Sequence, residues 1–166
     1  MQNRKEKSKK TVSFNLKFLL LKLLINEYPE ETNVVKIFRK IFPDRNKLKK
    51  FRIICSVKLN SIKFSNNQIK EALLREMPNL VAHKCKNSDG EKFEEVMAST
   101  SLAHLLEHMI IDIQAKHTNE VLLGTTEWID EESGLAKIEL SYTDDLVCLS
   151  AINEAVSLLN NIIQHI

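Results

Sequence analysis

The sequence predicts an α+β domain, with a small mixed or antiparallel sheet of about three to four strands and helices packed on one face. Residues 51–59 are rich in β-branched and apolar residues, as in a buried strand. Residues 121–129 and 135–142 form a second strand pattern, a hairpin around a turn at 130–134. Apolar stripes at helical spacing lie between and after these strands. A sheet covered by such helices is an α+β architecture.

The chain divides into two parts by charge. Residues 1–50 carry 14 Lys and Arg against 5 Asp and Glu, whereas residues 51–166 carry 10 against 17. At 166 residues and 43% hydrophobic content, the chain is long enough for one domain with a proper core. We therefore expect a basic arm with a helical extension over residues 1–50 and the α+β domain over residues 51–166.

The extension is expected to contain two helices. Residues 1–12 are polar and basic, which predicts a disordered arm, and residues 14–26 are apolar enough for a largely buried helix. Pro29 limits that helix, and a second helix is predicted over residues 30–42, where apolar residues recur at helical spacing. Pro43 ends it.

The middle of the chain is predicted to be helical with one polar turn. A helix over residues 67–77 is closed by Pro78. The segment 86–90 is a polar turn, and Phe93 and Val96 after it belong to a short helix.

Two further helices follow. Ser99 or Thr100 offers the N-cap of a helix that runs to about His117. After the predicted hairpin, Asp144 or Asp145 caps a last helix that carries an apolar stripe.

The first of these two helices contains the order H-x-x-E-H, formed by His104, Glu107 and His108. Residues four apart lie on one helix face, about 6 Å apart along the axis, so both imidazoles can converge on one ion. Inverted zinc peptidases use this order, with two histidines on the metal and the glutamate handling the proton. The competing interpretation is an amphipathic helix whose histidines are surface or core residues.

Further matches lead into and follow this motif. They are Ala72-Leu73-Leu74, Met77-Pro78-Asn79-Leu80, His83-Lys84-Cys85, Thr100, Leu102-Ala103-His104, Ile113-Gln114, Gly124-Thr125-Thr126, Gly134 and Tyr142. Over residues 52–163 the chain resembles the N-terminal domain of cyanophycin synthetase. It departs from that pattern at residues 1–50, which do not match, and at Asp112, where the family commonly has Glu. Neither ATP-dependent ligase domain is present, so synthesis of the polymer is not expected.

The resemblance implies a domain that holds cyanophycin, a poly-aspartate chain with arginine on each side chain. In some members it also implies a metal-dependent peptidase at the H-x-x-E-H helix. We therefore expect a zinc-dependent peptidase of cyanophycin-like or related peptides, with a non-catalytic polymer- or protein-binding module of the same fold as the alternative. An acidic body attracts arginine-rich material electrostatically.

Zinc at this site would be held by neutral nitrogens of His104 and His108, and a third protein group would leave one position open for water. The metal would activate that water and Glu107 would accept its proton as general base. The third ligand stays open. His83 is a candidate, although a structural histidine fits equally well, and Glu127 or Glu139 on the predicted hairpin are alternatives.

Other residues near the motif have supporting roles in this interpretation. Asp112 lies one further turn along the same helix face and is expected to orient the His108 ring. Cys85 could join His83 as a soft ligand, but a small buried thiol is favoured, as it is for Cys55 and Cys148.

The remaining signals concern location and partners. No secretory signal or membrane span is evident, and three cysteines without a C-x-x-C pair indicate reduced thiols, so a cytoplasmic location is expected. The acidic body and few aromatics argue against a dedicated nucleic-acid binder. The apolar faces of residues 14–50 are expected to mediate any self-association.

Overall fold

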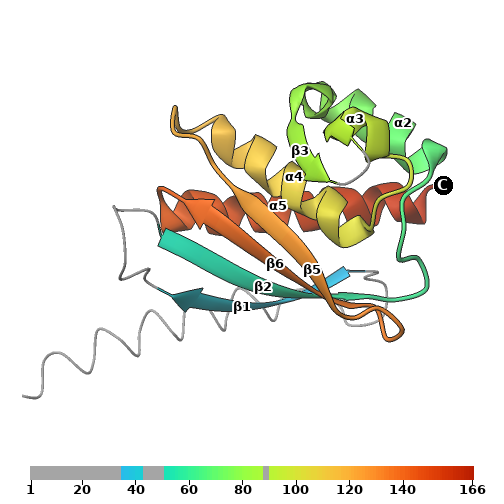
Figure 1. The fold of residues 1–166 in the computed structure, drawn as a ribbon, viewed down its shortest axis with the longest axis horizontal. Helices are drawn as coiled ribbons and strands as arrows, with labels where there is room; N and C mark the ends of the chain where they lie inside the picture. Colours follow the sequence, from blue (N-terminus) through green and yellow to red (C-terminus); the bar gives the residue numbers. More distant parts are fainter. Residues whose placement is uncertain (1–34, 43–50, 88–89) are drawn as a thin grey trace, which may run out of the picture. The chain divides into compact units, whose positions relative to one another are not determined.

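The computed structural model describes residues 35–42, 51–87 and 90–166. Its main sheet is four-stranded and antiparallel, in the order β1-β2-β6-β5 (Figure 1). The strands are β1 Val35–Phe42, β2 Phe51–Leu59, β5 Gly124–Asp130 and β6 Leu135–Tyr142. The α+β class is therefore confirmed, as are the predicted strand over 51–59 and the hairpin. The predicted arm over residues 1–12 and the helix over 14–26 lie outside the described residues.

The helix predicted over residues 30–42 is wrong where the structure describes it, because Val35–Phe42 is a strand. Ile37 lies opposite Val57 and Ile41 opposite Ile53 in the β1–β2 ladder. A short apolar run fits a helical or an alternating pattern about equally well. Pairing with β2, which no local pattern reveals, decides between them, and the sheet therefore begins before residue 51.

Helices cover one face of this sheet, and a small second sheet lies beside them. The helices are α2 Asn67–Glu76, the 3-10 helix η1 Pro78–Ala82, α3 Phe93–Val96, α4 Leu102–Ala115 and α5 Asp145–Gln164. The small sheet pairs β3 Lys84–Asn87 with β4 Gly90–Lys92. In Figure 1, α4 and α5 lie against the main sheet, and α2, α3 and β3 lie on the other side of α4.

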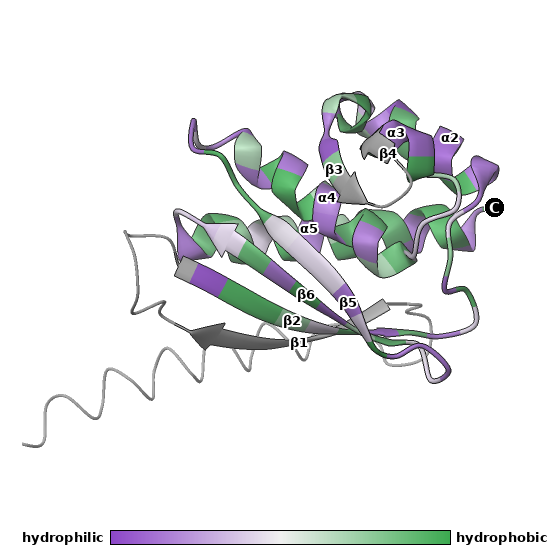
Figure 2. Cartoon of the chain, in the orientation of Figure 1, coloured by the Kyte–Doolittle hydropathy of each residue, from purple (hydrophilic) through white to green (hydrophobic). Residues whose placement is uncertain are grey.

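The core lies between the main sheet and these two helices, and much of β2, β6, α4 and α5 is coloured as hydrophobic in Figure 2. On β2 and β6 alternate residues are buried, namely Ile53, Cys55, Val57, Leu59, Ala136, Ile138 and Leu140. Among the described residues, α5 is the one helix long and apolar enough to cross a membrane. It has the buried stripe of a core helix, including Leu149, Ile152 and Leu159.

The two long helices begin at hydrogen-bonded caps. Asp144 caps α5 as predicted, because its carboxylate accepts hydrogen bonds from the next backbone amides at 2.9 Å. For α4 the cap is Ser101 rather than Ser99 or Thr100, since Ser101 Oγ accepts from His104 N at 3.1 Å. Ser101 also pairs with Phe64 in an isolated bridge, which fixes where the helix starts.

The β5–β6 hairpin is tied to the end of β2 through its turn. Gly134 has a φ of +76°, a conformation that L side chains rarely adopt. Its carbonyl accepts a hydrogen bond from Leu59 N at 2.9 Å, and a Cβ at this position would collide with the Leu59 carbonyl. A glycine is therefore required here, and the hairpin is held in one position relative to β2.

Candidate metal centre

The candidate site is built around α4, with contributions from the small β3–β4 sheet, α3 and β5. One face of α4, carrying His104 and His108, meets the small β3–β4 sheet and α3, while Glu107 on a neighbouring edge meets β5. Glu107 and His108 are each 5% exposed, and His104 is half-buried. The H-x-x-E-H helix predicted from the sequence is therefore a helix, and its polar residues point into the protein rather than into solvent.

Three potential ligand atoms converge beside α4. His104 Nε2 lies 3.2 Å from His108 Nε2 and 3.4 Å from Cys85 Sγ. All three atoms lie within 4.8 Å of one another, and among the described residues they form the one such group of His, Cys, Asp and Glu. Two imidazole nitrogens and one thiol are ligand types that Zn²⁺ accepts.

The second nitrogen of each imidazole has a partner behind the cluster. His104 Nδ1 lies 2.7 Å from Thr100 Oγ1, and His108 Nδ1 lies 3.1 Å from His83 Nδ1. His83 Nε2 in turn lies 3.3 Å from Asp112 Oδ1. Metal-binding histidines usually donate their other N–H to such a partner, which fixes the ring and its tautomer.

These contacts restrict where the imidazole protons lie. The Asp112 carboxylate accepts from Nε2–H of His83, so Nδ1 of a neutral His83 ring accepts from the Nδ1–H of His108. Thr100 Oγ1 can accept from or donate to His104 Nδ1, so two tautomers of His104 fit the contacts. With the proton on Nδ1, the Nε2 lone pairs of His104 and His108 face each other at 3.2 Å, an arrangement that a bound cation would relieve. With the proton on Nε2, His104 donates to His108 Nε2 and the two rings hold each other by a hydrogen bond.

Phe93 closes one side of the cluster. Its ring stacks on His108 with centroids 3.7 Å apart and planes at 14°, and it meets His104 edge-on at 5.5 Å. Phe93 N donates to His83 O at 3.0 Å, so the same residue joins α3 to the strand that brings Cys85. The fully buried Phe93 ring keeps water from this face of the imidazoles.

Glu107 is held against β5 by two residues. Thr126 Oγ1 donates to Glu107 Oε2 at 2.5 Å, which fixes the carboxylate. A Cβ on Gly124 would lie 2.6 Å from both Glu107 Cγ and Oε1, so only glycine leaves room for this side chain. The strand and the carboxylate therefore fit each other closely at this point.

Burial shifts the pKa values of His104, His108, Cys85 and Glu107. Burial lowers the pKa of His104, and burial together with the nearby His104 and His83 lowers that of His108 to about 3. Both rings are therefore neutral at physiological pH, as metal ligation requires. Burial and the negative charge of Glu107 raise the pKa of the Cys85 thiol. Burial raises the pKa of Glu107 itself, and the Thr126 hydrogen bond opposes that rise.

The other predicted site residues lie in different places. Glu127 pairs with Lys137, and Glu139 pairs with Arg52 at 2.5 Å, both at the surface and outside the cluster. His83 contacts the ring nitrogen of His108 that faces away from the converging atoms. Asp112 contacts His83, so that His83 lies between it and His108.

The small buried thiol expected at Cys85 is confirmed, and the convergence of this thiol with His104 and His108 was not expected. No site role was predicted for Phe93 or Thr126. One signal for Cys85 was available, because His83 and Cys85 are two residues apart and would share one face of a strand. The roles of Thr126 and Gly124 follow from the docking of β5 against α4, which no local pattern indicates.

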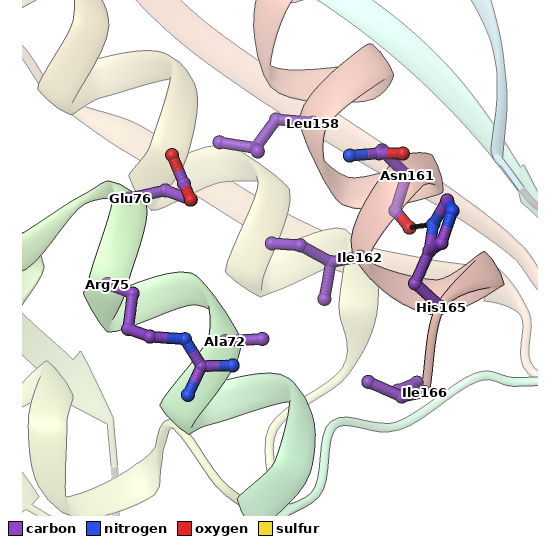
Figure 3. Close-up of a pocket in the computed structure, with 8 residues that line it drawn as sticks. All are labelled: Ala72, Arg75, Glu76, Leu158, Asn161, Ile162, His165 and Ile166. Atoms are coloured by element: carbon purple, nitrogen blue, oxygen red, sulfur yellow. Dashed lines mark hydrogen bonds between the residues drawn. The ribbon is translucent and has the colours of Figure 1, made fainter.

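A separate pocket of about 280 Å³ lies between α2 and the end of α5 (Figure 3). Arg75 and Glu76 line it from α2, and Ile162 and His165 from α5. None of the cluster residues lines this pocket. The candidate centre is therefore the cluster beside α4, not this pocket.

The fold and the cluster together describe an α+β protein with a candidate metal centre on its H-x-x-E-H helix. Comparison with protein families places the chain more closely. A model of the cyanophycin synthase-like N-terminal domain matches residues 53–164, and the chain belongs to that family. No curated protein matches the chain in the comparison made.

Proposed function

We propose that this chain is a zinc-dependent peptidase acting on cyanophycin-like or related peptides. The observation that carries the proposal is the convergence of Cys85 Sγ with the Nε2 atoms of His104 and His108 within 4.8 Å. This donor set fits a catalytic zinc site, which uses three protein ligands and keeps one position open. The proposed ligand set thus has Cys85 in the third position, and His83 orients His108 from behind.

When bound, zinc at such a site supplies Lewis acidity to a water molecule and to the scissile carbonyl. The chain's own residues supply positioning and proton transfer. Glu107 accepts a proton at a carboxylate oxygen and returns it to the leaving amine, a role helped by its raised pKa. Thr126 orients that carboxylate through the bond to Oε2, and Phe93 excludes water from the imidazoles.

Cys85 gives the proposal a pH signature. Its raised pKa keeps the thiol protonated, which opposes ligation, so a cation has to displace that proton. Binding is therefore expected to release one proton per site and to tighten with pH. All three cysteines are buried thiols outside disulfides.

The test measures zinc and hydrolysis separately. Protein purified without chelator and supplied with zinc is expected to hold about one zinc per chain by elemental analysis, since the proposal has a single three-ligand site. His108→Ala and Cys85→Ser should lose it, whereas Glu107→Gln should keep it and lose cleavage of an arginine-bearing poly-aspartate substrate. His117→Ala is the matched control, because this histidine is exposed beyond the helix. A wild type without zinc would refute the proposal.

A second candidate function is a non-catalytic polymer- or protein-binding module. The observation that favours it is that the cluster atoms lie at hydrogen-bonding distances, from 2.7 to 3.4 Å, so the side chains can hold one another in place. Zinc binding in the wild type together with no cleavage of any peptide would favour this module over the enzyme.

A further inference from the structure

β5 is an edge strand of the main sheet. It pairs with β6 on one side, and no other strand in the described part of the chain pairs with its second edge. An unpaired edge presents a row of backbone N–H and C=O groups that can pair with another extended chain. This strand borders the candidate general base, because the α4 helix that carries Glu107 packs against β5.

The β5–β6 ladder determines which backbone groups face outward. Ser141 N donates to Leu123 O at 2.8 Å, so this opposed pair is hydrogen-bonded. Opposed pairs in antiparallel sheets alternate between bonded and non-bonded. Gly124, opposite Leu140, and Thr126, opposite Ile138, are therefore non-bonded positions. Their N–H and C=O groups face the free edge of β5.

The same two residues hold Glu107. Thr126 Oγ1 bonds its carboxylate at 2.5 Å, and the missing Cβ of Gly124 makes room for its side chain. A peptide paired with the outward groups of Gly124 and Thr126 would therefore run alongside the strand positions that touch Glu107. The free backbone groups and the candidate general base thus lie at the same two positions.

The surroundings of β5 favour one kind of peptide. Exposed apolar side chains lie just before the strand and in it, with Val121 at 71% and Leu123 at 61% exposure before it and Ile129 at 54% within it. Exposed acidic residues lie along and beyond it, namely Glu120, Glu127, Asp130, Glu131 and Glu132, of which Glu127 is paired with Lys137. Apolar contacts and negative charge together match an extended peptide with apolar and basic side chains.

We propose that such a peptide binds as an added strand on β5, antiparallel to it, through the backbone of Gly124 and Thr126. The proposal rests on the proposed function, since it names how substrate reaches Glu107. Backbone pairing would supply affinity, and the side chains that alternate along the added strand would supply selectivity.

The test uses a fluorescein-labelled peptide of alternating valine and arginine, about nine residues long, a common strand length. Its binding to Glu107→Gln, which should not cleave it, is followed by fluorescence anisotropy. N-methylation at every second residue is expected to weaken binding at least about tenfold, and methylation of the intervening residues by less than about twofold, because only alternate N–H groups face β5. Losses without this period of two would overturn strand addition.

A matched pair of protein variants tests the same edge. Thr126→Pro removes an outward N–H without removing a ladder bond to β6, which edge strands tolerate. Thr126→Val keeps that N–H and loses only the hydroxyl. In the Glu107→Gln background the proline variant should bind at least about tenfold more weakly than the valine variant, since only it lacks the N–H. Circular dichroism checks that both fold, and equal binding by two folded variants would overturn the proposal.

Other outcomes separate this proposal from the peptidase. Period-two binding in a protein that holds no zinc would support strand addition and refute the enzyme. Stoichiometric zinc and peptide cleavage, together with methylation losses that show no period of two, would support the enzyme and refute strand addition. A dimer of the parent protein that Thr126→Pro dissociates, with no peptide binding, would show that a second copy occupies the edge and would overturn the proposal.

Discussion

The α4 helix separates two layers of opposite character. On one side, α4 and α5 pack against the sheet through apolar side chains, with Leu106, Ile138 and Ile152 fully buried. On the other side, imidazoles and a thiol gather beside Phe93, with the Asp112 carboxylate behind them. The apolar layer gains free energy by burial in any neutral buffer, whereas the polar layer depends on protons and on any ion it binds. Stability and the candidate chemistry are thus divided between the two sides of one helix.

The largest expected effect removes apolar contacts from the first layer. Leu106→Ala should lower the free energy of unfolding by about 3 kcal/mol, because a fully buried leucine leaves a cavity. Leu146→Ala is the matched control, since Leu146 is 72% exposed, and should cost less than about 0.5 kcal/mol. Urea unfolding with a chelator present measures both. Similar losses in the two variants would contradict the assignment of the core.

The second layer should instead respond to metal. At free zinc of about 100 times its dissociation constant, the folded protein should gain about 2.7 kcal/mol. Cys85→Ser should abolish most of this gain, whereas Cys148→Ser, at a buried cysteine in α5, should retain it. Thermal unfolding with and without zinc makes the comparison. An equal zinc effect in both variants would remove Cys85 from the ligand set.

Without metal, the polar layer should make stability fall in acid. The pKa of His108 is lowered to about 3 from 6.5, so the unfolded chain takes up a proton below pH 6.5 that the folded chain refuses. Its contribution is complete above pH 6.5 and is lost as pH falls toward 3, by about 1.4 kcal/mol at pH 5.5. The lowered pKa of His104 adds in the same direction. The raised pKa of Glu107 acts oppositely, favouring the fold below pH 4.5 and losing that contribution as pH rises through its folded value.

Urea midpoints between pH 7.5 and 5.5 test this slope, with a chelator present. His108→Gln keeps a polar group beside His83 but cannot titrate, so it should show a flatter profile than the wild type. Parallel profiles would mean that His108 is charged in the folded protein, contrary to the assignment above.

The smallest expected effect concerns a buried amide on α4. Gln114 is 2% exposed, and its Nε2 has no hydrogen-bond partner among the described residues. Gln114→Met keeps the length of the side chain and removes the buried donor, so it should raise the free energy of unfolding by about 1 kcal/mol. Glu71→Met, at an exposed site on α2, is the control. A loss of stability in Gln114→Met would show that the amide has a partner.

The sequence predicts those elements of the fold that local patterns determine. The strand over 51–59, the hairpin, α4 and α5 follow from local periodicity and caps, and each is confirmed. The strand β1 does not follow from local patterns, because its apolar residues fit the period of a helix as well as that of a strand. Only the pairing of β1 with β2 decides between them. The fold class survives this error, since an added edge strand leaves the layer order unchanged.

The candidate site was predictable only as far as one helix carries it. His104, Glu107 and His108 are fixed by spacing of three and four residues on α4. Cys85 joins them through a chain separation of 19 residues, and Thr126 reaches Glu107 across another 19. Such meetings depend on how β3 and β5 pack against α4, which local spacing does not encode.

The stacking of Phe93 on His108 has a spectroscopic consequence. A ring lying parallel to the imidazole, with centroids 3.7 Å apart, shields the imidazole protons by its ring current, which moves their NMR resonances upfield. That displacement would be present only while α3 covers the cluster. The chemical shifts of the His108 ring protons therefore report whether Phe93 is stacked on the imidazole, without any assay for zinc or cleavage.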